Sequence, residues 1–260
     1  MTYPKVSILI ANYNNAKYIA ECINSLKKQT YKNIEIIFFD DFSQDTSIKE
    51  IKSFKNVKLI QNIDKTSIGS FNQMHAYEEA FKLSEGEIIL FLDSDDYYHE
   101  TKIQEVVNYF NKHREAKIVF DYPLIKSNYK ISFIKKKKKK FFKQWPYIHP
   151  TSCISLRREN FQNIYKAITL KEYPDVWIDF RICLYAKYVL NDFHIIEKNL
   201  TYYRQIETSI SSKFKHLSKN WWKRRMEAHN YLIFLVKKEN INFKKNIDFY
   251  ITKLINFFIK

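Results

Sequence analysis

Residues 5–11 read KVSILIA, residues 34–39 read IEIIFF, residues 57–60 read VKLI and residues 87–92 read EIILFL. Short apolar runs that are rich in β-branched and aromatic residues are typical of strands buried on both faces. Apolar residues recur at spacings of three and four in the helical-length segments between these runs, which are residues 16–29, 44–54 and 70–84. Strands that alternate with helices predict right-handed crossovers and a buried parallel sheet.

The second half of the chain continues this pattern less regularly. Helices are expected at 99–113, 158–166, 176–190 and twice within 215–260, and strands at 117–122, 151–156, 193–196 and 200–204. Residues 123–150 show no clear periodicity. We therefore predict an α/β fold with a mostly parallel sheet, flanking helices and a C-terminal helical extension.

Length, composition and cysteine spacing indicate a globular protein that has no membrane-spanning segment and is not held by disulfides. A chain of 260 residues, 45% of them hydrophobic, is long enough to bury a sizeable core. No signal-peptide pattern is present and no run reaches the roughly 20 apolar residues that span a bilayer, so we expect a cytoplasmic protein or one peripheral on the inner face of the cytoplasmic membrane. Cys22, Cys153 and Cys183 lack CxxC spacing, which argues against a disulfide framework or a zinc site.

The net charge of +16 is unevenly distributed. Residues 1–120 hold 15 Lys and Arg against 17 Asp and Glu, whereas residues 121–260 hold 29 against 11. A basic surface attracts nucleic acid, anionic lipid or a phosphorylated substrate, and charge alone does not choose among them. The six lysines at 135–140 favour a solvated loop, with a specific phosphate or lipid contact as the alternative.

Acidic and amide residues follow the ends of predicted strands, at 12–15, 40–45 and 93–96. Ligands of an open parallel sheet bind beyond the carboxyl ends of its strands, so these segments should share one rim. Two carboxylates one residue apart, Asp93 and Asp95, can both reach a hard divalent cation and leave positions for phosphate oxygens. The sequence thus predicts an Mg²⁺ or Mn²⁺ site, and the alternative is that these acids cap the following helix.

Two longer segments resemble a known family. SILIANYNNAKYIAECINSLKKQTYKNIEIIFFDDFSQDTS at 7–47 resembles the amino-terminal signature of the inverting family-2 glycosyltransferases, which have the GT-A fold. EGEIILFLDSDDYY at 85–98 resembles the metal-binding strand and DxD element of the same family. The likeness implies a GT-A catalytic domain over 1–212, with a nucleotide-sugar-binding half at 1–122, an acceptor-side half at 123–212, and basic aromatic helices at 213–260.

The resemblance implies a nucleotide site at matching positions of this chain. A nucleotide-sugar donor, most readily a UDP-sugar, would contact Ala11, Asn12, Tyr13, Asp40, Asp41, Asn72, Asp93, Ser94 and Arg204, and Asp93 and Asp95 would hold Mg²⁺ or Mn²⁺. The chain departs from the family pattern at Phe71, where an Arg is frequent, and at Ile206, where a His is frequent.

KEYPDVWIDFRICLYA at 171–186 resembles the family's acidic segment and the aromatic helix that follows it. This likeness implies that Asp175 is the general base that takes a proton from the acceptor hydroxyl as its oxygen attacks the anomeric carbon. Asp179 is the alternative base, although the family comparison favours a structural role for it. Trp177, Asp96 and His149 are expected on the acceptor side, and His149 also fits an ordinary packed histidine.

The sequence therefore predicts a metal-dependent glycosyltransferase of cell-surface polysaccharide synthesis, such as capsule or lipopolysaccharide, with a glycan or lipid-linked acceptor. Its basic C-terminal helices could lie on an anionic membrane, pack on the core or form a dimer contact. Three other interpretations stay open: a non-catalytic relative, a haloacid-dehalogenase type of phosphatase with FLDSDDYY as its DxD strand, and a nucleic-acid-binding protein that uses the lysine run, Trp221 and Trp222. Because no nucleic-acid motif accompanies these residues, no nucleic-acid partner is expected.

Overall fold

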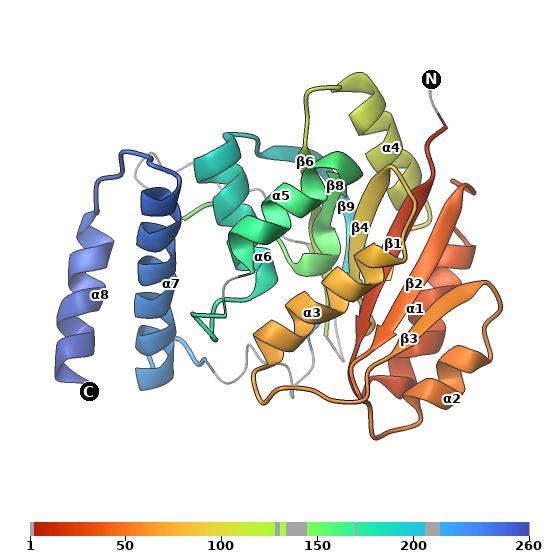
Figure 1. Ribbon diagram of the computed structural model, residues 1–260, viewed down its shortest axis with the longest axis horizontal. Helices are drawn as coiled ribbons and strands as arrows, with labels where there is room; N and C mark the ends of the chain where they lie inside the picture. Colours follow the sequence, from red (N-terminus) through yellow and green to blue (C-terminus); the bar gives the residue numbers. More distant parts are fainter. Residues whose placement is uncertain (1–2, 128–130, 134–144, 170, 206–213, 260) are drawn as a thin grey trace.

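The computed structural model describes residues 3–127, 131–133, 145–169, 171–205 and 214–259 (Figure 1). The lysine run at 135–140 lies outside the described residues. The strands are β1 (Val6–Asn12), β2 (Ile34–Asp40), β3 (Val57–Gln61), β4 (Ile88–Asp93), β5 (Tyr97–Tyr98), β6 (Ile118–Lys126), β7 (Ile131–Phe133), β8 (Ile154–Arg157) and β9 (His194–Arg204). The helices are α1 (Ala16–Lys27), α2 (Ser47–Lys52), α3 (Gly69–Lys82), α4 (Lys102–Lys112), η1 (Thr151–Cys153), α5 (Arg158–Ile168), α6 (Ile178–Leu184), η2 (Tyr185–Leu190), α7 (Lys219–Lys238) and α8 (Ile247–Phe258).

One sheet runs through the molecule in the order β3-β2-β1-β4-β8-β6-β9-β5, and β7 pairs with β6. The first four strands in this order pair in parallel, and β8 runs antiparallel to both β4 and β6. The register opposes Asn12 to Asp40 and Ala11 to Asp93. The three segments that follow β1, β2 and β4 therefore leave the sheet at the same edge.

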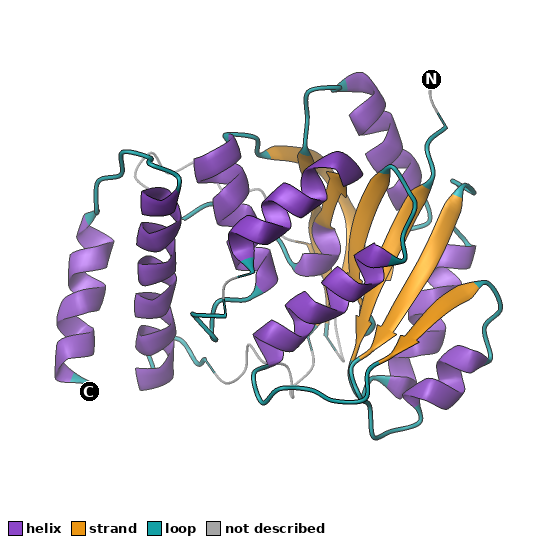
Figure 2. Cartoon of the chain, in the orientation of Figure 1, coloured by secondary structure: helices purple, strands orange, loops and turns teal. Residues whose placement is uncertain are grey.

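Helices cover both faces of the sheet (Figure 2). On one face, α1, α2 and α4 pack against the strands through residues such as Ile23, Ile51 and Val106. On the other, α3, α5 and α6 share a core cluster that also includes Tyr231 and Leu235 of α7. Helix α7 is thus part of the core, and α8 stands outside it at one end of the molecule (Figure 1). The domain boundary predicted between residues 212 and 213 stays a prediction.

The predicted α/β fold with a mostly parallel sheet and flanking helices is confirmed, with local corrections. The strand predicted at 151–156 begins as a 3-10 turn, in which the Cys153 N–H donates to the Pro150 carbonyl at 2.8 Å, and becomes a strand at Ile154. The two strands predicted at 193–196 and 200–204 form a single strand, β9. Its exposed centre, Glu197 and Lys198, hid this continuity from the hydrophobic pattern.

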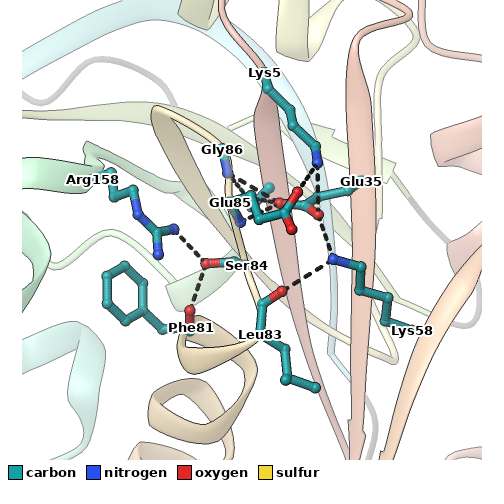
Figure 3. A network of polar contacts seen from close by, with 10 residues as sticks. Lys5, Glu35, Lys58, Phe81, Leu83, Ser84, Glu85, Gly86 and Arg158 are labelled. Atoms are coloured by element: carbon teal, nitrogen blue, oxygen red, sulfur yellow. Dashed lines mark hydrogen bonds and ion pairs between the residues drawn. The ribbon is translucent and has the colours of Figure 1, made fainter.

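The buried carboxylate of Glu35 joins the starts of neighbouring strands (Figure 3). It lies at the edge of the sheet opposite to the loops that follow β1, β2 and β4. Glu35 Oε1 accepts hydrogen bonds from Ser7 Oγ at 2.6 Å and from the Gly86 N–H at 3.0 Å, and Lys58 Nζ lies 3.0 Å from Oε2. A Cβ at Gly86 would lie 2.6 Å from the backbone nitrogen of Ser7, so this close approach requires glycine. Burial opposes ionisation of Glu35, but hydrogen bonds from Ser7, the Glu85 N–H and Lys58 lower its pKa to about 2.

This network predicts a specific loss of stability in acid. Because the pKa of Glu35 is lower in the folded chain than its ordinary value of 4.5, the stabilisation is present above that pH and is lost as the pH falls toward 2. The free energy of unfolding of the wild type, measured in urea, should therefore fall more steeply with acidification than that of Glu35→Gln, by up to about 3 kcal/mol. The matched control is Glu85→Gln at an exposed member of the network. Lys5 lowers the pKa of Glu85 too, but solvent screens this exposed pair, so the variant should keep most of the wild-type slope. An equally steep fall in Glu35→Gln would contradict this role.

Candidate active site

A cleft of about 940 Å³ lies beyond the carboxyl ends of β1 and β4. Among the predicted site residues, its walls contain Ala11, Asn12, Tyr13, Asp41, Asn72, Asp93, Asp95, Asp175, Trp177 and Arg204. The fold therefore brings the three strand-end segments together with the acidic segment before α6, as the sequence predicted.

The two acids that follow β2 face different ways. Asp41 lines the cleft, and its Oδ1 accepts a hydrogen bond from Asn62 Nδ2 at 3.0 Å. Asp40 is buried behind it and accepts from Asn12 Nδ2 and Ser43 Oγ, both at 2.7 Å. Asp40 therefore joins the loops after β1 and β2, and the nucleotide contact expected of it stays a prediction.

Asn72, Ser94 and Arg204 are also engaged by neighbouring groups. The Asn72 amide bonds Thr66 three times, as an acceptor from its N–H and Oγ1 and as a donor to its carbonyl. Ser94 is fully buried and its Oγ accepts from Asn15 Nδ2 at 3.1 Å. Arg204 reaches the cleft but donates to the Asp95 carbonyl at 2.7 Å and pairs with Glu21. Asn72 and Arg204 border the predicted nucleotide site, whereas Ser94 supports it from beneath.

Asp93 and Asp95 differ in the hydrogen bonds that their carboxylates receive. Asp93 Oδ1 accepts hydrogen bonds from Tyr77 Oη at 2.8 Å and Gln73 Nε2 at 3.0 Å, which partly offset the rise in its pKa that burial causes. The Asp95 carboxylate receives no hydrogen bond from any other residue that the structure describes. Burial and the neighbouring Asp93 raise the pKa of Asp95 to about 7, against the opposing effect of Arg204.

Asp96 and His149 are buried and are not among the residues that line the cleft, and the acceptor-side contacts expected of them stay predictions. Asp96 is buried and accepts from Ser152 Oγ at 2.6 Å and from the Arg204 N–H at 2.8 Å. His149 is also fully buried, with Nδ1 2.7 Å from the carbonyl oxygen of Asp121, and burial lowers its pKa to about 4. Both side chains therefore bond to groups of the protein itself.

The hydrogen-bond donors around Asp93 and Asp95 indicate whether the cleft suits a cation. A carboxylate without a donor, beside a second carboxylate in a partly dry cleft, is an arrangement that a hard divalent ion would stabilise. Two carboxylates leave most positions of such an ion to phosphate oxygens and water. Within the described ranges, the one group of three ligating side chains that converge within 4.8 Å is elsewhere, at His75, Glu78 and Glu79 on α3. The cleft thus fits an ion that a bound diphosphate completes.

Asp175, Asp179 and Trp177, from the segment before α6 and its first turn, also line the cleft. The Asp175 carboxylate makes no hydrogen bond or ion pair with any described residue. Asp179 Oδ1 accepts from the Phe180 N–H at 2.7 Å, and its surroundings, chiefly through desolvation, raise its pKa to about 6. Trp177 packs so closely on the start of α3 that a Cβ at Gly69 would lie 3.0 Å from its ring. Asp175 is therefore the less engaged of the two acids.

Several lining residues escaped sequence reasoning. They are Lys65, Tyr203, Phe214 and Arg224. Lys65 Nζ lies 3.0 Å from the ring centre of Tyr13, and Arg224 comes from α7, a helix interpreted from sequence as part of a basic surface. The signal that was available for Tyr203 was its place beside Arg204 at the end of a strand; no comparable signal marked Arg224.

A largely parallel sheet whose strand ends deliver two acidic loops to one cleft, which a further acid also lines, is the arrangement expected of the GT-A class of glycosyltransferase. The chain belongs to glycosyl transferase family 2, whose family model matches residues 7–165.

Named relatives agree with this assignment. The chain is 29% identical over 217 residues to an uncharacterized glycosyltransferase of Nostoc sp., which covers 77% of this chain and 64% of that protein. It is 39% identical over 129 residues to the UDP-Glc:alpha-D-GlcNAc-diphosphoundecaprenol beta-1,3-glucosyltransferase WfaP of Escherichia coli, covering 48% of this chain and 46% of that protein. The chain thus spans less than two thirds of the length of either relative.

Solved structures match the fold over nearly the whole chain. TarS of Staphylococcus aureus in complex with UDP-GlcNAc superposes with a TM-score of 0.63 at 19% identity, over 97% of this chain and 70% of that chain. The mannosyltransferase PcManGT of Pyrobaculum calidifontis, in complex with GDP-Man and Mn²⁺, gives a TM-score of 0.54 at 13% identity, over 98% and 69%. At these identities the likeness establishes a shared GT-A fold.

The raised pKa of Asp95 predicts a stability change between acid and neutral pH. Between its ordinary value of 3.8 and about 7, the folded chain holds this proton more tightly than the unfolded chain, so the contribution of Asp95 to stability falls as pH rises. In metal-free buffer, Asp95→Asn should gain thermal stability over the wild type as the pH is raised through this interval. Asp64→Asn, at an exposed loop acid, should show no such gain. A wild-type-minus-variant difference that is independent of pH would contradict the assigned pKa.

Proposed function

We propose that this chain is an inverting glycosyltransferase that moves a sugar from a UDP-sugar to a hydroxyl of a glycan or lipid-linked acceptor in bacterial surface-polysaccharide synthesis, such as capsule or lipopolysaccharide. The observation that carries the proposal is the meeting of Asp41, Asp93 and Asp95 with Asp175 across one cleft. A donor held at the first three would present its anomeric carbon toward the fourth.

The donor end is built for a nucleoside diphosphate. Asp41, Asn12 and Tyr13 stand where a base and ribose would bind, and Asp93 and Asp95 stand where the diphosphate would meet Mg²⁺ or Mn²⁺. Such an ion, when bound, supplies positive charge to the departing diphosphate. Relatives support the choice of UDP, because WfaP is named for UDP-Glc and TarS was solved with UDP-GlcNAc.

The acceptor end is built around Asp175. Its carboxylate makes no hydrogen bond or ion pair with a described residue, and it lines the same cleft as Asp93 and Asp95. An inverting transfer needs one such base on the side of the anomeric carbon away from the diphosphate. Trp177 offers beside it an aromatic face of the kind on which a sugar ring can pack. The lipid-linked acceptor in the name of WfaP supports an acceptor of this kind.

A donor screen tests the proposal. Nucleotide release should be fastest with a UDP-sugar and Mn²⁺ or Mg²⁺ and should vanish with chelator. Asp175→Asn should lower kcat by about 10²- to 10⁴-fold while UDP binding is kept, because proton transfer in the transition state is lost. Asp179→Asn is the matched control and should retain most activity. Failure of every nucleotide sugar to be hydrolysed or to raise the melting temperature would reject the enzyme, and a larger loss in Asp179→Asn would reassign the base.

The outer face of α8 suits a second part of the proposal, an anionic membrane surface. Its apolar residues are 46–76% exposed and recur on one side of the helix: Ile247, Tyr250, Ile251, Leu254, Phe257 and Phe258. Phe249 and Thr252 on the opposite side are buried, so this stripe points away from α7. Figure 1 shows α8 as the outermost helix at its end of the molecule.

The positive charge of the residues around this stripe favours an anionic lipid surface as its binding partner. Residues 214–259 hold ten Lys and Arg against three Asp and Glu, and Lys253 is exposed beside the stripe. An exposed apolar stripe in a basic part of the chain is the pattern of helices that lie in the interface of an anionic bilayer. None of the helices within the described residues is both long and apolar enough to cross a membrane.

Vesicle flotation tests this surface. The wild type should float with vesicles of equimolar phosphatidylglycerol and phosphatidylcholine, and less so in high salt or with phosphatidylcholine alone. The double variant Leu254→Ser, Phe258→Ser should lose flotation, whereas Ile63→Ser, at an equally exposed apolar residue near β3, should keep it. Retained flotation of the double variant would reject the lipid surface. A change of its oligomeric state in sedimentation, without any flotation of the wild type, would assign the stripe to a second copy.

A further inference from the structure

Helix α7 holds the backbone of Asp175 at two points. Glu227 Oε1 accepts a hydrogen bond from the Asp175 N–H at 2.8 Å, and Arg224 Nε donates to the Asp175 carbonyl at 3.1 Å. Residues 224 and 227 are three apart on one helix and so project from the same side of it. Both polar groups of this one residue's backbone are therefore satisfied by a helix that begins more than forty positions later in the chain.

The segment that carries Asp175 has little regular structure of its own. It precedes α6, which begins at Ile178, and Tyr173 within it has a positive φ of 66°. On its other side, Ser70 Oγ at the start of α3 donates to the Pro174 carbonyl at 2.6 Å. The position of Asp175 is thus set by two flanking helices, α3 and α7.

The anchoring helix is itself firmly placed. Tyr231 and Leu235, farther along α7, are fully buried in the core cluster that α7 shares with α3, α5 and α6. The Arg224 guanidinium also lies over the ring of Phe214, with 4.5 Å between its central carbon and the ring centre. A firmly packed helix that hydrogen-bonds both the N–H and the carbonyl of one residue can hold the backbone of that residue in place.

We propose that Glu227, assisted by Arg224, is a positioning residue that orients the Asp175 carboxylate across the cleft, an inference that rests on Asp175 as the base of the proposed transfer. The two bonds fix the backbone of Asp175 and make no use of its carboxylate, which remains available to the acceptor hydroxyl. Glu227 touches neither substrate nor metal in this scheme. Its effect should therefore fall on kcat and leave the donor KM unchanged.

Removing the Glu227 carboxylate, which accepts the hydrogen bond from the Asp175 N–H, should displace Asp175. Glu227→Ala leaves the Asp175 N–H without its partner and lets the segment shift, and a misplacement of about 1 Å at a reacting group lowers rate by about 100-fold. Glu227→Gln keeps a side-chain oxygen that can accept the same hydrogen bond and should restore kcat to within a few-fold of wild type. Glu239→Ala changes another acid of the same region, at the end of α7, and should leave both kcat and KM unaltered.

The experiment measures kcat, donor KM and amide hydrogen exchange at residues 171–177 in the full chain. The expected result is a loss of kcat in Glu227→Ala with unchanged donor KM, faster exchange of the Asp175 amide, and rescue of both by Glu227→Gln. Unchanged exchange and kcat in Glu227→Ala would overturn the proposal, as would equal losses in the Ala and Gln variants. If the wild type transfers no sugar, the proposed function fails, and the exchange data still decide whether Glu227 fixes this segment.

Discussion

Mutual repulsion of carboxylates at one edge of the sheet is the constraint on which the site depends. The parallel register that packs β1 against β2 and β4 also delivers Asp41, Asp93, Asp95 and Asp96 to that edge. Asp96 accepts hydrogen bonds from Ser152 and a backbone N–H, and Asp93 accepts them from Tyr77 and Gln73, whereas the Asp95 carboxylate receives none from another described residue. The charge of the Asp95 carboxylate therefore remains for a ligand or cation to stabilise, at the place where we propose that a diphosphate binds.

The C-terminal part of the chain belongs to this site more closely than its composition suggests. Its basic residues suggest a surface appendage, yet Tyr231 and Leu235 of α7 are core residues, and Arg224 reaches the cleft. A helix that is buried on one side can present a charged residue at a fixed place on another. Helix α7 thus joins the core to the part of the cleft lined by Asp175 and Arg224, while α8 beyond it keeps an apolar face to solvent.

The sequence predicted what depends on local pattern. Alternating apolar strands and helices fixed the order of the elements, and the strand-end acids indicated the cleft, because in a parallel sheet the position along the chain determines the edge. It could not separate Asp40 from Asp41, since both are buried and adjacent residues at a strand end point opposite ways, so that only one of them lines the cleft. Burial of His149 and the contacts of Arg224 depend on distant segments, which no local periodicity records.

The central claim is that Asp93 and Asp95 bind a nucleoside diphosphate through a divalent ion. Isothermal titration of UDP into the protein, with Mn²⁺ and then with chelator, tests it most directly. Tight binding with Mn²⁺, its loss with chelator and its loss in the double variant Asp93→Asn, Asp95→Asn are the predicted results. UDP binding of equal strength with and without the metal, or undiminished in that variant, would contradict it.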